Sequence, residues 1–202
     1  MDNGIVSGAL SLKRVLSFAL GEERSQTAAA SLLRAYGSVS VIADVLIEDL
    51  ARCEGMTPQA AILVKLCFYL RSRSITDKLK IGECYTEEQI EKYLAGLFLG
   101  LCAETLYLIM FDAKGRYIGT EFMGEGTVCS SDIYPRKLVE CAIRRGAEAV
   151  IIAHNHPRGL AEPSREDAVA TEMIEEVMRT SGVRFLGHYT VAGLDVRKVP
   201  TF

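Results

Sequence analysis

The chain has 202 residues, of which 49% are hydrophobic, and its formal net charge is −3 at pH 7. This length and apolar content suffice for one sizeable domain or for a small and a medium one, and they exclude a largely disordered chain. The slightly acidic balance excludes a strongly basic polyanion-binding protein, so binding to nucleic acid would require a local patch.

Targeting signals and cysteine pairs are both missing from the sequence. The N-terminus lacks the pattern of a signal peptide, and no apolar run reaches the ~18 residues of a membrane span. The six cysteines form no Cys-x-x-Cys pair and stand well apart. This spacing favours reduced, buried thiols over a zinc ribbon or a disulfide framework. We therefore expect a cytoplasmic protein with no membrane partner.

The first part of the chain, residues 1–76, is predicted to be an all-helical module. Apolar residues recur at helical spacing, and glycine or a Thr-Pro pair stands at the expected boundaries. The expected helices are one that ends before Gly21 and three over residues 27–36, 38–50 and 58–73. Residues 77–85 are polar and interrupted by glycine, and we expect them to form a linker.

Residues 86–202 are predicted to form an α/β (α+β) domain, with a mixed sheet flanked by helices. Apolar, β-branched runs predict strands, and the segments between them carry helical periodicity or capping residues. Helices interleaved with strands in this way are typical of an α/β layer architecture. The expected strands cover residues 105–111, 116–123, 149–152 and 184–191, and the expected helices begin at Thr86, Pro135 and Ser164.

A histidine pair follows the buried strand over residues 149–152. His154 and His156 are two positions apart in an extended segment, so their imidazoles can point to the same place. Ser164 then caps a helix that carries Asp167 in its first turn. Two imidazoles and one carboxylate are a typical catalytic zinc site, with Asp167 as the third ligand. The alternative is two loop histidines and an aspartate that only caps its helix, but the full pattern with Pro157 favours the metal site.

The pattern His-x-His-Pro-x6-Ser-x-x-Asp at residues 154–167 resembles the signature of the JAMM (MPN+) metalloproteases. Its longer form, His-Asn-His-Pro-x-Gly-x-x-x-Pro-Ser-x-x-Asp, is similar to the RadC branch of bacterial proteins, and the resemblance covers about the last half of the chain. It implies a JAB/MPN-like fold and a zinc-dependent hydrolase in which a metal-activated water attacks a peptide or isopeptide bond. The implied partner is a peptide or protein substrate.

The resemblance also implies two catalytic residues. In the JAMM family a glutamate upstream of the histidines is the general acid/base, and Glu104 matches it at the start of the strand over residues 105–111. Glu121 and Glu125 are the alternatives if the strand register differs. The serine of the motif, here Ser164, donates a hydrogen bond to the oxyanion in that family.

Two further residues near the motif are assigned indirect or structural roles. Asn155 lies between the two histidines in the chain, so it should point away from the metal and shape the loop. RadC proteins usually carry Asp-His where this chain has Gly187-His188. We expect His188 to be a packed or surface histidine.

DNA is the alternative partner, because the RadC name implies DNA repair. RadC proteins carry a helix-hairpin-helix near the position of Gly55, where backbone amides approach a phosphate. Here Thr57 stands in place of the second hairpin glycine, and Glu54 adds a negative charge. A side chain hinders close approach of the backbone, so a packing module is favoured over a DNA clamp.

Overall fold

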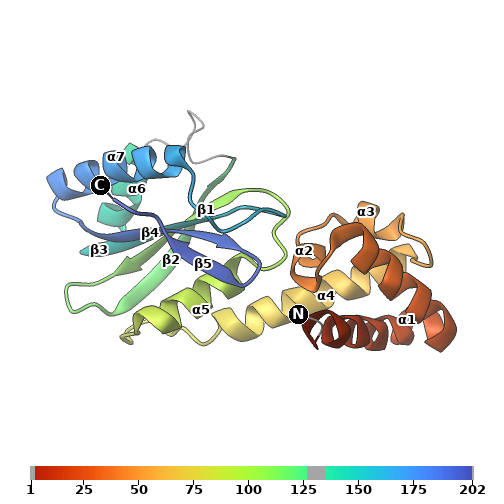
Figure 1. Cartoon of the computed structure of the whole chain (residues 1–202). Coiled ribbons are helices and arrows are strands. Elements are labelled where there is room, and N and C mark those ends of the chain that lie inside the picture. The colour runs from red at the N-terminus through yellow and green to blue at the C-terminus, as the bar shows by residue number, and fades with distance from the viewer. Residues whose placement is uncertain (1–2, 127–134, 202) are drawn as a thin grey trace. The chain divides into compact units, whose positions relative to one another are not determined.

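The computed structural model describes residues 3–126 and 135–201 (Figure 1). Two compact units are present. One comprises Met1–Ser74 and Leu99–Cys102, and the other comprises Ile75–Phe98 and Ala103–Phe202. Within the second unit, the expected linker over residues 77–85 is paired with the following hairpin, where Cys84 and Arg116 form an antiparallel bridge.

The first unit is helical. Its elements are α1 (Asn3–Tyr36), which is interrupted by a non-helical Gly21, α2 (Val39–Ala43), α3 (Ile47–Ala51) and α4 (Pro58–Thr76). The single helix expected over residues 38–50 is wrong, because the chain leaves helical geometry after Ala43. The Asp44 carboxylate accepts the Gly100 N–H at 3.2 Å, and Leu46 is extended. This long-range hydrogen bond is not visible in the local pattern.

Gly55 has a packing role in the first unit. Its φ is +81°, a region that L side chains rarely adopt, and a Cβ at this position would lie 3.0 Å from the backbone nitrogen of Ala28. The turn before α4 therefore lies directly against α1. The buried core around it includes Leu16, Leu32 and Leu50, each fully buried.

The second unit contains a mixed five-stranded sheet, which confirms the predicted α/β class. Its elements are α5 (Glu87–Phe98), β1 (Thr105–Phe111), β2 (Tyr117–Glu125), α6 (Pro135–Arg144), β3 (Ala149–Asn155), α7 (Arg165–Thr180), β4 (Arg184–Ala192) and β5 (Asp195–Lys198). The strand order is β2-β1-β3-β4-β5, with β3 and β4 parallel and the other neighbours antiparallel. The sequence did not predict β5. This edge strand is mostly exposed, so it lacks hydrophobic alternation.

Helices cover both faces of this sheet. In Figure 1, α6 and α7 lie on one face and α5 lies on the other. The core beneath α6 and α7 includes Leu108, Leu138, Ile152 and Met178, all fully buried. Every residue of β3 is buried, and this central strand carries His154 and leads directly to His156.

The described cysteines and helices test two further expectations. Cys53, Cys67, Cys84, Cys102 and Cys141 are free, whereas Cys129 lies outside the described residues. Burial was the wrong expectation for Cys67 and Cys84, which are exposed. Over residues 3–126 and 135–201, no helix combines the length and hydropathy needed to cross a membrane.

Candidate metal centre

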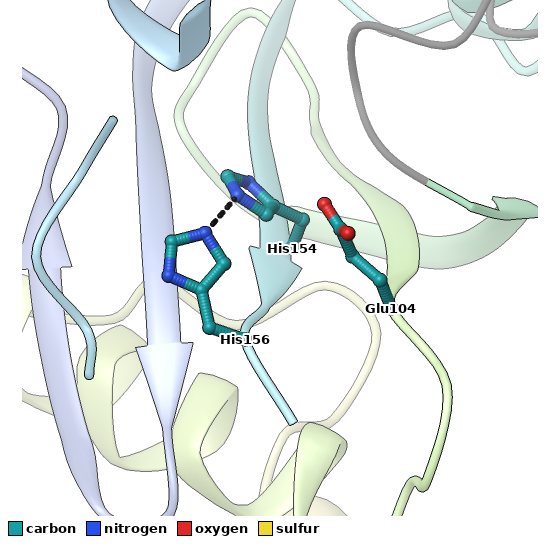
Figure 2. Close-up of side chains that lie close together, drawn as sticks. All are labelled: Glu104, His154 and His156. Carbon is teal, nitrogen blue, oxygen red and sulfur yellow. Dashed lines mark hydrogen bonds between the residues drawn. The ribbon is translucent and has the colours of Figure 1, made fainter. Parts of the chain in front are cut away.

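The carboxyl end of β3 brings the two histidines of the motif together. The extended backbone points both imidazoles to the same side, and the two Nε2 atoms are 3.0 Å apart (Figure 2). The His154 side chain is fully buried, whereas that of His156 is 23% exposed. The backbone N–H of His156 donates to the Val191 carbonyl at 2.8 Å, so the pairing with β4 continues beyond Asn155.

The Nδ1 atoms of the two histidines face away from this meeting point. His156 Nδ1 lies 2.8 Å from the Leu160 carbonyl oxygen. Because a carbonyl oxygen only accepts, Nδ1 carries the hydrogen, which leaves the lone pair of a neutral His156 on Nε2. His154 Nδ1 lies 2.7 Å from His188 Nε2.

His188 is packed against the site. It is fully buried on β4, and its Nδ1 lies 2.7 Å from Thr171 Oγ1. Burial, together with the nearby His154, lowers the pKa of His188 to about 3. The sequence analysis treated it as a packed or surface residue and missed its contact with His154. Only the register of the parallel β3–β4 pair, in which Ile152 is opposite His188, brings it there.

Asp167 approaches the histidines from the start of α7. Its Oδ1 lies 3.2 Å from His154 Nε2, and its Oδ2 lies 3.7 Å from His156 Nε2. Burial raises the pKa of the Asp167 carboxyl, but the adjacent His154 and His156 imidazoles and the hydrogen bond from Ser164 outweigh it and hold the pKa far below the usual range. The nearby Asp167 carboxylate is also the largest cause of the raised pKa of His156. Asp167 is therefore a carboxylate at neutral pH.

Ser164 and Asp167 form a reciprocal capping box. Ser164 Oγ accepts the Asp167 N–H at 3.0 Å, and Asp167 Oδ2 accepts the Ser164 N–H at 2.7 Å. The Ser164 hydroxyl donates its hydrogen to the same Oδ2 at 2.6 Å. The Ser164 hydroxyl, which was expected to donate to an oxyanion, thus donates its only hydrogen to Asp167 in this structure.

Glu104 completes a group of residues that could hold a metal ion. One carboxylate oxygen of Glu104 and one nitrogen of each of His154 and His156 lie within 4.8 Å of one another. Figure 2 shows Glu104 reaching toward His154 from the segment that precedes β1. The two alternatives are not members of this group: Glu121 on β2 forms an ion pair with Arg145, and Glu125, which is opposite Thr105 at the end of β2, is exposed.

Asn155 supports the segment that carries Glu104. Its side chain is turned away from the histidine pair: Nδ2 donates to the Ala103 carbonyl at 3.2 Å, and Oδ1 accepts the Thr105 N–H at 2.8 Å. Asn155 is only 3% exposed. Its hydrogen-bond partners are thus backbone groups and not the histidines, in line with the expected role in loop geometry, but the sequence carried no sign that these partners flank Glu104.

The spacing of the donor atoms can be compared with that of zinc ligands. Two ligands bound to a tetrahedral zinc at about 2.0–2.2 Å are separated by about 3.3–3.6 Å. The distances among His154 Nε2, His156 Nε2 and the Asp167 carboxylate oxygens are 3.0, 3.2 and 3.7 Å. They match the zinc value to within a few tenths of an ångström, so the residues fit the metal.

Comparison with known proteins identifies the family. The model of the RadC-like JAB domain matches residues 84–196, more than half of the chain. The chain belongs to the RadC-like JAB family. The match includes β1 to β4 together with Glu104, both histidines of the motif and Asp167.

Curated relatives extend this likeness to most of the chain. The UPF0758 protein of Janthinobacterium sp. (strain Marseille) is 31% identical over 169 residues, which cover 83% of this chain and 75% of that protein. A UPF0758 protein of Vibrio cholerae serotype O1 (strain M66-2) is 31% identical, with 82% and 74% covered. Neither of these two names states an activity. The support for a JAMM-like hydrolase comes from membership of the RadC-like JAB family and holds at the level of the family.

Proposed function

We propose that this member of the RadC-like JAB family is a zinc-dependent hydrolase that cleaves a peptide or isopeptide bond. His154, His156 and Asp167 would hold the zinc. The observation that carries the proposal is that the two imidazole Nε2 atoms lie 3.0 Å apart and each lies within 3.7 Å of an oxygen of the Asp167 carboxylate. Two imidazole nitrogens with a carboxylate favour zinc over Mg²⁺ or Ca²⁺, which prefer oxygen ligands.

Three protein ligands would leave a fourth position for the reaction. Zinc, when bound, supplies a Lewis acid that polarises a carbonyl group and lowers the pKa of water. The substrate would enter on the side of Glu104 and His156, because these side chains are partly exposed whereas His154 and Asp167 are buried.

Glu104 is the proposed general acid/base. Its carboxylate lies beside the histidine pair, where it can take a proton from the attacking water as the new C–O bond forms. The same proton would then pass from Glu104 to the leaving nitrogen as the C–N bond breaks. A carboxylate is needed for both transfers, because it is a base in the first and its conjugate acid in the second.

Ser164 is the proposed donor to the oxyanion. Its hydroxyl would turn from Asp167 Oδ2, 2.6 Å away, to the oxygen on which negative charge develops. The Ser164 backbone N–H would remain on Asp167 Oδ2, so the carboxylate would keep one of its two bonds to this residue.

Metal content and hydrolysis together test the proposal. Wild-type protein, His156→Ala and Glu104→Gln are purified without added metal and analysed for zinc, then assayed on a peptide library and on a lysine-linked isopeptide. We expect one zinc per chain in wild type and in Glu104→Gln, none in His156→Ala, and turnover by the wild type alone. A wild-type protein that takes up no zinc even when it is supplied would refute the metal site. Undiminished turnover by Glu104→Gln would refute the role of Glu104.

A further inference from the structure

A chain of hydrogen bonds runs from the backbone of α7 to the most buried imidazole of the site. Thr171, one turn after Asp167, donates its hydroxyl hydrogen to the Asp167 carbonyl at 2.6 Å. The same Oγ1 lies 2.7 Å from His188 Nδ1, and His188 Nε2 lies 2.7 Å from His154 Nδ1. All three of these side chains are fully buried.

The hydrogen bond from Thr171 to the Asp167 carbonyl determines which atom donates the hydrogen in the other two bonds. A carbonyl oxygen only accepts, and a threonine hydroxyl has a single hydrogen, so the bond to Asp167 uses that hydrogen. Thr171 Oγ1 can then only accept from His188, which places a hydrogen on His188 Nδ1. In a neutral ring the other nitrogen is an acceptor, so His188 Nε2 accepts a hydrogen from His154 Nδ1.

We infer that Thr171 and His188 are positioning residues that hold the hydrogen of His154 on Nδ1 and so present the Nε2 lone pair to a cation. The part that concerns zinc rests on the proposed function. His156 reaches the same state by a shorter route, through the Leu160 carbonyl. Each histidine thus donates its Nδ1 hydrogen to an acceptor. For His156 the acceptor is a backbone carbonyl, and for His154 it is His188, which is linked through Thr171 to the Asp167 carbonyl.

If His188 donated to His154 instead, the site could not bind a metal ion through His154 Nε2. If His188 Nε2 carried the hydrogen, it would donate to His154 Nδ1, and a neutral His154 would then carry its own hydrogen on Nε2. That nitrogen lies 3.0 Å from His156 Nε2 and 3.2 Å from Asp167 Oδ1, in the centre of the proposed site. The hydroxyl of Thr171 therefore excludes the tautomer of His154 that could not bind zinc.

The tautomer can be measured in metal-free protein. The chain has only three histidines, so ¹⁵N-labelled imidazoles can be assigned with His156→Ala and His188→Gln. We expect wild-type His188 to be neutral with its hydrogen on Nδ1, and His154 Nδ1 to be protonated. A hydrogen on His188 Nε2 would overturn the inference, whatever the protein does with zinc.

A matched pair of variants tests the role of Thr171. Thr171→Val keeps the shape but removes the hydroxyl, so the His188 hydrogen should move to Nε2, and zinc affinity measured by chelator competition should fall ten- to a hundredfold. Thr171→Ser keeps the hydroxyl and should keep both the tautomer and the affinity. Wild-type affinity in Thr171→Val, or an equal loss in Thr171→Ser, would overturn the inference.

The two measurements separate this inference from the proposed function. If wild-type protein shows the expected tautomer but binds no Zn²⁺, the proposed function fails and the hydrogen-bond chain stands. If zinc binds in wild type and in Thr171→Val with equal affinity, the metal site stands and the role of Thr171 is refuted.

Discussion

The Asn155 side chain holds the backbone on both sides of Glu104. One amide group donates to the Ala103 carbonyl at 3.2 Å and accepts from the Thr105 N–H at 2.8 Å. Asn155 is the last residue of β3, so it joins the strand of the histidines to the segment of the proposed general acid/base. The two sides of the candidate site are thereby fixed to each other.

Replacing Asn155 should therefore separate metal binding from activity. In Asn155→Asp a carboxylate oxygen would face the Ala103 carbonyl, and this buried, unsatisfied contact should displace Glu104 and cost about 1–3 kcal/mol of stability. We expect unchanged zinc content and a fall of kcat/KM by about 10²-fold, because general acid/base catalysis contributes 10²–10⁴. Undiminished kcat/KM on the substrate cleaved by wild type would contradict this positioning role.

Zinc should stabilise the fold through the histidine pair. A ligand that binds only the folded state at about 100 times its Kd adds roughly 2.7 kcal/mol to the free energy of unfolding. Thermal unfolding of wild type with and without Zn²⁺ should show this rise, and His156→Ala should show none. A similar rise in His156→Ala would place the bound ion elsewhere.

Ser164→Ala should lower both the stability of α7 and the affinity for zinc. The variant loses the acceptor for the Asp167 N–H and the hydroxyl that donates to Asp167 Oδ2. Loss of an N-cap costs about 1 kcal/mol, which urea unfolding can measure, and a less firmly held Asp167 should weaken zinc binding. Ser164→Thr is the control, since it keeps a hydroxyl. Equal stability of Ser164→Ala and wild type would show that the capping box is not formed in solution.

His188 should make the metal-free protein less stable in mild acid. Burial lowers its pKa from 6.5 to about 3, so between these values the unfolded chain binds a proton that folded His188 does not. The free energy of unfolding therefore falls as the pH drops below 6.5, by about 2 kcal/mol from pH 7 to pH 5 for this group.

The variant His188→Gln isolates this effect. The raised pKa of His156 acts in the opposite direction, because its stabilisation is present at low pH and is lost as the pH rises. Both proteins retain His156, so the difference between their urea unfolding curves at pH 7 and pH 5 reports His188. An equal loss of stability in both proteins would show that His188 is protonated in the folded state.

Gly55→Ala should destabilise the helical unit more than Gly37→Ala. Both glycines have nearly the same positive φ, +81° and +78°, so both variants incur the conformational cost of about 1–2 kcal/mol. At Gly55 the added Cβ would also lie 3.0 Å from the Ala28 nitrogen, whereas at Gly37 nothing lies within 4 Å. Chemical unfolding measures the difference. Equal losses would mean that the turn does not lie against α1 in solution.

The local parts of the site could be predicted from the sequence. His154 and His156 are two residues apart in extended backbone at the end of a strand, and Ser164 and Asp167 are three apart at a helix start, so backbone geometry alone brings each pair together. The boundaries of β1 and the start of α7 were predicted for the same reason, because hydrophobic periodicity and capping act over a few residues.

The long-range parts were decided by the tertiary structure. Glu104 could be proposed from the family resemblance, but only the antiparallel pairing of β1 with β3, in which Leu106 is opposite His154, places it at the histidines. His188 and Asn155 acquire their partners in the same way, 34 and 50 residues away. Asp44, at the break after α2, accepts a hydrogen bond from Gly100, 56 residues later. Local periodicity carries no information about which distant backbone will lie opposite a side chain, so sheet register and packing decide these contacts.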